Sequence, residues 1–197
     1  MFWLLVLLPE ILAGAVLLIP PFLIYQVRFF HSWKRTLLYF LFGCYLTTVL
    51  CLVGFPNVKY HGFDANINLI PIVSMAENIT DTVLNIFMFL PLGFFLPLLW
   101  PRYRKPASTL LFALCATLAI ELSQLFTFRA TDVNDLITNV LGALCGFFVA
   151  KVITRDFRRH PEDANSKIDL PLICGTAVFV MFFLQPFLYP ILWNLMN

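Results

Sequence analysis

Long apolar runs are the feature that most constrains this chain. A transmembrane helix needs about 20 mostly apolar residues. Six such runs follow one another, near 2–26, 36–55, 82–100, 107–127, 135–150 and 170–193. Hydrophobic residues make up 60% of the 197 residues and charged residues only 12%, against roughly 25% charged residues in soluble domains. A soluble domain of this length has too little interior to bury so much apolar surface. The sequence therefore predicts an integral membrane protein.

The apolar runs are continuous and do not alternate with polar residues as the strands of a membrane barrel do. The expected fold is therefore all-α, a polytopic bundle of transmembrane helices that forms a single domain over residues 1–197. Six spans are expected. The run 135–150 is short for a span, so five spans are the alternative.

The basic residues predict the orientation, because Lys and Arg in short connections favour the cytoplasmic side. Eleven of the thirteen Lys and Arg lie in the connections 28–35, 101–106 and 151–169. The opposite connections, 56–81 and 128–134, contain the other two. We therefore expect a multi-pass protein of the plasma membrane with the three basic connections in the cytoplasm. No basic patch is interleaved with stacking aromatic residues, which argues against a nucleic-acid partner.

Polar side chains within membrane spans are costly and commonly mark a functional site. Eight of them fall near the outer ends of three spans and in the connection between two of these spans, and we call them the polar cluster: Asp81, Asn85, Glu121, Gln124, Arg129, Asp132, Asp135 and Asn139. Spacings of three and four residues place those within a helix on one face. Gly142 and Gly146 continue the face of Asp135 and Asn139, at a spacing typical of closely packed membrane helices. The sequence predicts one ligand-binding site or one buried network.

Three ordered elements within about 66–150 resemble the VanZ-like family. The residues from Asn85 to Gly93 match an Asn-x-x-x-Phe-x-Pro-x-Gly element. The residues from Glu121 to Gly142 resemble a second block of acidic and amide residues, and the short element is Asn68-Leu-Ile-Pro71. The resemblance implies a bacterial cell-envelope protein associated with low-level resistance to the glycopeptide antibiotic teicoplanin. It implies no biochemical mechanism.

Two functional classes and one structural role remain open for the polar cluster. As a binding site, it can exchange hydrogen bonds with a membrane lipid, a lipid-linked cell-wall precursor or a lipoglycopeptide. As an enzyme, the protein would be a membrane-embedded hydrolase or transferase for a lipid-linked substrate, with Glu121, Asp135 and Asp81 as candidate catalytic residues. Paired carboxylates can also hold a hard divalent cation. As a structural network, Arg129 and the amides would tie three helices together.

The cysteines give no sign of a metal or disulfide framework. All five lie within predicted spans, without a Cys-x-x-Cys pair and without histidine at ligand spacing. We expect free, buried thiols and neither a cofactor nor a resident metal, and the sequence predicts no oligomeric state.

Overall fold

The computed structural model describes residues 2–63, 67–68, 79–127, 131–154 and 167–196. Within these residues, six helical segments are long and apolar enough to cross a membrane: Leu7–Phe30, Trp33–Leu52, Ile79–Leu99, Pro106–Gln124, Val133–Ile153 and Asp169–Leu195. They confirm the predicted all-α transmembrane fold and its six spans. The run expected over 135–150 belongs to a helix of 21 residues, which is long enough to be a full span.

The chain divides into two compact units, which are described one by one. The first comprises Met1–Gly62 with Ser166–Asn197, and the second comprises Phe63–Asn165. The single domain expected over residues 1–197 stays a prediction.

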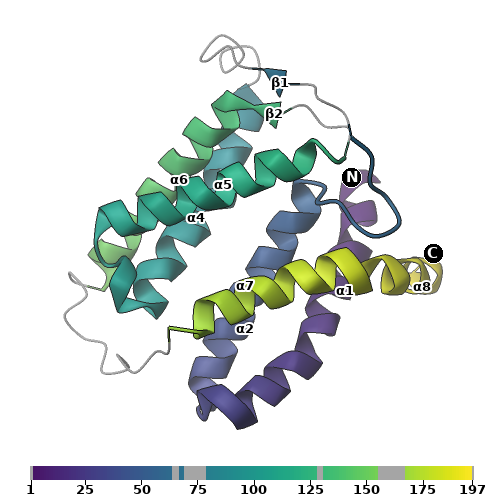
Figure 1. The fold of residues 1–197 in the computed structure, drawn as a ribbon, viewed down its shortest axis with the longest axis horizontal. Helices are drawn as coiled ribbons and strands as arrows, with labels where there is room; N and C mark the ends of the chain where they lie inside the picture. The colour runs from purple at the N-terminus through teal and green to yellow at the C-terminus, as the bar shows by residue number, and fades with distance from the viewer. Residues whose placement is uncertain (1, 64–66, 69–78, 128–130, 155–166, 197) are drawn as a thin grey trace. The chain divides into compact units, whose positions relative to one another are not determined.

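The first unit is built from helices at both ends of the chain, drawn in purple to blue and in yellow in Figure 1. Its elements are α1 (Phe2–Tyr25), the π-helix η1 (Gln26–Phe30), α2 (Trp33–Leu52), α7 (Asp169–Phe179), the π-helix η3 (Val180–Leu184) and α8 (Gln185–Met196). Helix α1 packs against α2 and α8, and α2 packs against α7. Ser32 is the N-cap of α2, and its side chain accepts a hydrogen bond from the backbone N–H of Arg35 at 3.5 Å.

The second unit holds the three helices that carry most of the polar cluster. Its elements are β1 (Ile67–Asn68), α4 (Ile79–Leu99), the 3-10 helix η2 (Pro101–Tyr103), α5 (Pro106–Gln124), β2 (Thr131–Asp132) and α6 (Val133–Ile153). The two-residue strands pair in parallel, Ile67 with Thr131 and Asn68 with Asp132. Helix α6 packs against both α4 and α5, and its contact with α4 is the most extensive between any two elements.

Glycines let the backbones of α4 and α6 touch. A Cβ added at Gly93 would lie 1.8 Å from the carbonyl oxygen of Ala143, and one at Gly142 would lie 2.3 Å from that of Ile86. A Cβ at Gly146 would lie 1.9 Å from the carbonyl oxygen of Leu90. Only hydrogen fits at these three positions, which confirms the close packing predicted for Gly142 and Gly146.

The cysteines are free, as expected, but only one of them is buried. Cys51 is buried, whereas Cys115 and Cys145 are exposed on transmembrane helices. The expectation of buried thiols is therefore wrong for these two. A thiol behaves as a small hydrophobic group, so a helix surface that faces lipid accepts it as well as a protein interior does.

Candidate functional site

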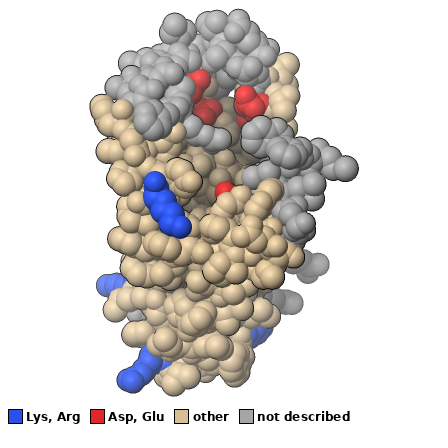
Figure 2. Space-filling view, turned by 90° about the vertical axis from the view of Figure 1, so that its right-hand side faces the viewer, with Lys and Arg blue, Asp and Glu red and all other residues tan. Residues whose placement is uncertain are grey.

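The described members of the polar cluster lie at one end of the second unit. This end holds the first residues of α4 and α6 and the last residues of α5. The basic connection 101–105 joins the opposite ends of α4 and α5, and Lys151 lies in the last turn of α6. Figure 2 shows acidic side chains, in red, mostly near the top of the face that it draws, and red also appears closer to the middle of that face. Within this unit, the described polar side chains therefore lie toward the same end of the three helices.

A hydrogen bond joins α4 to α6 at this end. Asn85 Nδ2 donates to Asp135 Oδ1 at 2.7 Å, and both side chains are partly buried. Asn85 lies one turn into α4 and Asp135 lies in the first turn of α6. The glycine contact deeper in the same helix pair brings these two faces together, so the amide reaches the carboxylate directly.

A second link joins α5 to the beginning of α6. The backbone N–H of Asp132 donates to Glu121 Oε2 at 3.0 Å, and Glu121 is only 3% exposed. Asp132 is the N-cap of α6, because its Oδ1 accepts from the backbone N–H of Asn134 at 2.8 Å. The same oxygen accepts from Asn134 Nδ2, also at 2.8 Å. The two acids thus fix the start of α6 against the end of α5.

Two buried amides complete the site from α5 and α6. Asn139 is 1% exposed, and its Nδ2 donates to Thr117 Oγ1 at 2.8 Å. Among the described residues, Asn139 Oδ1 and Gln124 Oε1 are buried atoms without a hydrogen-bond partner. If the Asn139 amide were turned over, Thr117 would still pair with only one end of it. Each amide therefore retains unused hydrogen-bonding capacity in the interior.

The structure brings together most, but not all, of the predicted site residues. The carboxylates of Asp81, Asp132 and Glu121 lie close enough to the carboxylate of Asp135 to interact with its charge. The Asp81 side chain is exposed in the first turn of α4, at the rim of the site. Arg129 lies outside the described residues.

Sequence reasoning missed Asn134, which is 4% exposed and bonded to Asp132. The signal was available in part, because aspartate is a preferred N-cap residue and its side chain commonly bonds to the residue two positions on. Backbone pairing also places Asn68 beside Asp132. Asn68, the first residue of the short element, therefore lies beside Asp132 of the second acidic block.

The side chains of the site offer a ligand carboxylate oxygens and amide groups. Among the described residues, no group of three or more His, Cys, Asp and Glu side chains is arranged to hold a metal ion. The side-chain hydroxyls near the site are used in local structure. Ser123 Oγ donates to the Ile120 carbonyl at 2.7 Å, and Thr138 Oγ1 donates to the Asn134 carbonyl at 3.0 Å.

Comparison with known proteins identifies the family of the chain. A sequence model of the VanZ/LLP1 family matches residues 37–154, which is more than half of the chain. The matched region contains α4, α5 and α6 completely, together with every residue of the polar cluster. No curated protein and no solved structure matches the chain. The chain belongs to the VanZ/LLP1 family.

Proposed function

We propose that this VanZ-like protein of the bacterial plasma membrane binds the polar part of an amphiphile at its outer face, through the polar cluster. The ligand class is a membrane lipid, a lipid-linked cell-wall precursor or a lipoglycopeptide. In this orientation the basic connections 28–35, 101–106 and 151–169 face the cytoplasm. Through such binding, the protein contributes to resistance against teicoplanin-type glycopeptides.

The observation that carries the proposal is the pair of buried amides with unused hydrogen-bonding capacity. A buried polar atom without a partner costs about 1–3 kcal/mol. A network that only held helices together would gain nothing from Gln124 Oε1 and Asn139 Oδ1, which pair with no described residue. A ligand that carries hydroxyl, ammonium or amide N–H groups supplies the missing donors. Headgroups, sugars and peptides at the outer membrane surface all carry such donors.

The test removes this capacity without removing volume. Gln124→Met replaces one amide by an apolar side chain of similar size. Asn139→Leu replaces the other and is combined with Thr117→Val, so that neither partner of their hydrogen bond remains. If the amides serve a ligand, both variants keep the melting temperature of the parent protein in detergent. They no longer confer teicoplanin resistance when they are expressed in a susceptible bacterium. Replacing an unsatisfied group, or both partners of a hydrogen bond, by apolar groups of similar shape is close to neutral for stability. Retained resistance in both variants would refute the proposal.

Thr109→Val is the matched control for these two variants. Thr109 is fully buried in α5, and its Oγ1 donates to the Tyr103 carbonyl at 2.6 Å, away from the polar cluster. Its loss removes a satisfied hydrogen bond, worth about 1 kcal/mol. The control should therefore melt at a lower temperature and keep resistance, which is the opposite pattern.

An enzymatic function is the second candidate, and the proximity of the acids favours it. Glu121 and Asp135 lie within electrostatic range of each other in a partly buried site. Two carboxylates so placed can act as general acid and general base on a lipid-linked substrate. Because Ser123 and Thr138 are bonded to backbone carbonyls, water would be the nucleophile for hydrolysis. Incubation of the purified protein with a radiolabelled lipid-linked precursor distinguishes the two candidate functions. Turnover that Glu121→Gln abolishes supports an enzyme. Binding without turnover supports a binding protein.

A further inference from the structure

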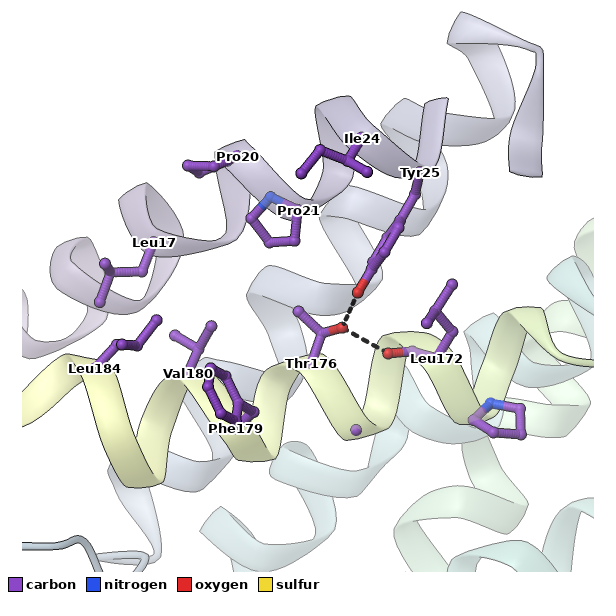
Figure 3. Close-up of a pocket in the computed structure, with 12 residues that line it drawn as sticks. Leu17, Pro20, Pro21, Ile24, Tyr25, Leu172, Thr176, Phe179, Val180 and Leu184 are labelled. Carbon is purple, nitrogen blue, oxygen red and sulfur yellow. Dashed lines mark hydrogen bonds between the residues drawn. The ribbon is translucent and has the colours of Figure 1, made fainter. Parts of the chain in front are cut away.

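The first unit contains an apolar groove that is separate from the polar cluster. It lies between the second half of α1 and the segment formed by α7 and η3, and its volume is about 530 Å³. This volume lies within the range of about 300–1,000 Å³ that small-molecule sites occupy. Figure 3 shows Leu17, Pro21 and Ile24 of α1 facing Thr176, Val180 and Leu184 across the groove.

The walls of the groove offer almost no hydrogen-bonding capacity. The Tyr25 and Thr176 hydroxyls are 2.7 Å apart and bond to each other, and Thr176 Oγ1 also contacts the Leu172 carbonyl oxygen at 2.7 Å (Figure 3). Pro20 and Pro21 have no backbone N–H to donate. A polar ligand would find few partners here, whereas a hydrocarbon chain needs none.

The groove runs along one half of the membrane span. From Leu17 to Ile24 the helix rises about 10 Å, at 1.5 Å per residue. One leaflet contributes about 15 Å of the roughly 30 Å hydrocarbon core. The groove therefore has a length suited to part of a single acyl chain within one leaflet.

Positive charge flanks the end of the groove that adjoins the basic connections. Arg28 is exposed and lies three residues beyond Tyr25, within η1. Lys167 is also exposed and lies four residues before Pro171, which lines the groove. The acid at this end, Asp169, is 3% exposed and accepts a hydrogen bond from the Tyr39 hydroxyl at 3.1 Å. Among the residues that the structure describes at this end, the exposed charges are thus basic, which complements an anionic headgroup.

Both helices of the groove change to π-helical geometry in this region. Tyr25 is followed directly by η1, and Val180 and Leu184 belong to η3. Single-turn π segments occur often at functional sites. A π turn adds a residue to the turn, so it shifts the side chains that follow it around the helix axis.

We infer that this groove binds an anionic phospholipid, with one acyl chain against α1 and α7 and the phosphate between Arg28 and Lys167. By the charge rule that orients the spans, the site faces the cytoplasmic leaflet. The inference does not depend on the function proposed for the polar cluster. Its ligand is a resident lipid of the basic side of the membrane.

Gly175 offers a way to fill the groove without a clash. It lines the groove, and a Cβ added there would meet no atom within 4 Å. Gly175→Leu therefore occupies the space of the acyl chain while α7 stays intact. Val178→Phe is the matched control, since Val178 lies on the same helix, is 44% exposed and does not line the groove.

The experiment compares lipids on the purified full-length protein, by native mass spectrometry and by melting temperature in detergent. Phosphatidylglycerol is expected to bind and to raise the melting temperature, and phosphatidylcholine with the same acyl chains is expected to do so much less. Gly175→Leu should abolish this difference, and Val178→Phe should keep it. Arg28→Gln and Lys167→Gln should each weaken phosphatidylglycerol binding about fivefold, whereas Lys105→Gln, an exposed lysine of the second unit, should not.

Several outcomes overturn the inference. Equal binding of the two phospholipids would show that charge plays no part. Binding of a free fatty acid as tight as that of phosphatidylglycerol would show that the phosphate is not recognised. Unchanged phosphatidylglycerol binding by Gly175→Leu would place the lipid elsewhere, and a dimer that Gly175→Leu dissociates would identify a second copy of the chain as the occupant. Glu121→Gln in the polar cluster should leave the preference for phosphatidylglycerol over phosphatidylcholine unchanged, which separates this inference from the proposed function.

Discussion

Gly146→Ala tests the contact between α4 and α6 most directly. A Cβ at this position would lie 1.9 Å from the Leu90 carbonyl oxygen and 2.9 Å from the Phe94 nitrogen. Ordinary van der Waals contact begins near 3.4 Å, so the helices must separate locally by about 1.5 Å. Both opposing atoms belong to the backbone of a helix, so neither can turn aside as a side chain would.

The expected cost follows from this geometry. Overpacking a well-packed core costs typically about 1–3 kcal/mol, occasionally more, and we expect about 3 kcal/mol here because the clash is between backbones. The separation would also stretch the 2.7 Å hydrogen bond from Asn85 to Asp135. The variant should therefore lose stability and the geometry of the polar cluster together.

Melting of the detergent-solubilised protein measures the effect, and two other glycines calibrate it. Gly14→Ala brings a Cβ to 3.2 Å from the Thr47 Cβ, a tight contact that a small shift relieves. Gly175→Ala meets nothing within 4 Å, and alanine is a better helix former than glycine by about 1 kcal/mol. The melting temperatures should rank Gly175→Ala highest, Gly14→Ala next and Gly146→Ala lowest. A Gly146→Ala protein as stable as the parent would refute the reasoning.

Three further predictions follow from the polar cluster and the basic connections. Asp132→Ala removes the N-cap of α6 and should destabilise the protein by about 1 kcal/mol in thermal melting; an unchanged melting temperature would contradict that role. Glu121→Gln and Asp135→Asn keep shape but remove charge, so they should abolish teicoplanin resistance at unchanged melting temperature, and resistance that only tracks melting would favour a structural network. In a protein without its native cysteines, Val58→Cys should react with an impermeant thiol reagent from outside the cell, whereas Lys167→Cys should react only after permeabilisation; the reverse pattern would invert the topology.

The number of spans could be predicted from the sequence because the thickness of the membrane fixes the length of an apolar helix. The weakest prediction concerned the run 135–150, whose helix begins at Val133 in the structure. The polar Asn134 at its start and the charged Lys151 in its last turn concealed the two ends of this helix from an argument based on hydropathy. The N-cap of Asp132 gave the better signal, because capping depends on residue type and not on apolarity.

The candidate site could be predicted in part. Helical spacing placed Glu121 on the polar face of α5 and Asp135 on that of α6, and the structure links each of them to another member of the polar cluster. The unpaired oxygens of Gln124 and Asn139 could not be predicted, since whether an amide finds a partner depends on the exact approach of another helix. The division into two units and the groove beside Pro20 likewise depend on tertiary packing that no local pattern encodes.

The glycine contact and the polar link between α4 and α6 together set one register. Asn85 bonds to Asp135, fifty residues further along the chain, and Gly93 meets Ala143 at the same offset. If α4 slipped along α6 by one turn, the bond between Asn85 and Asp135 would break. A larger side chain would then replace Gly93 at its contact with α6. Hydrogen bonds between membrane helices contribute only about 0.6 kcal/mol on average, so the Asn85 bond adds little stability and instead selects the alignment. That alignment positions α6, and with it Asn139, whose unused amide oxygen is one of the two that the proposed ligand would engage.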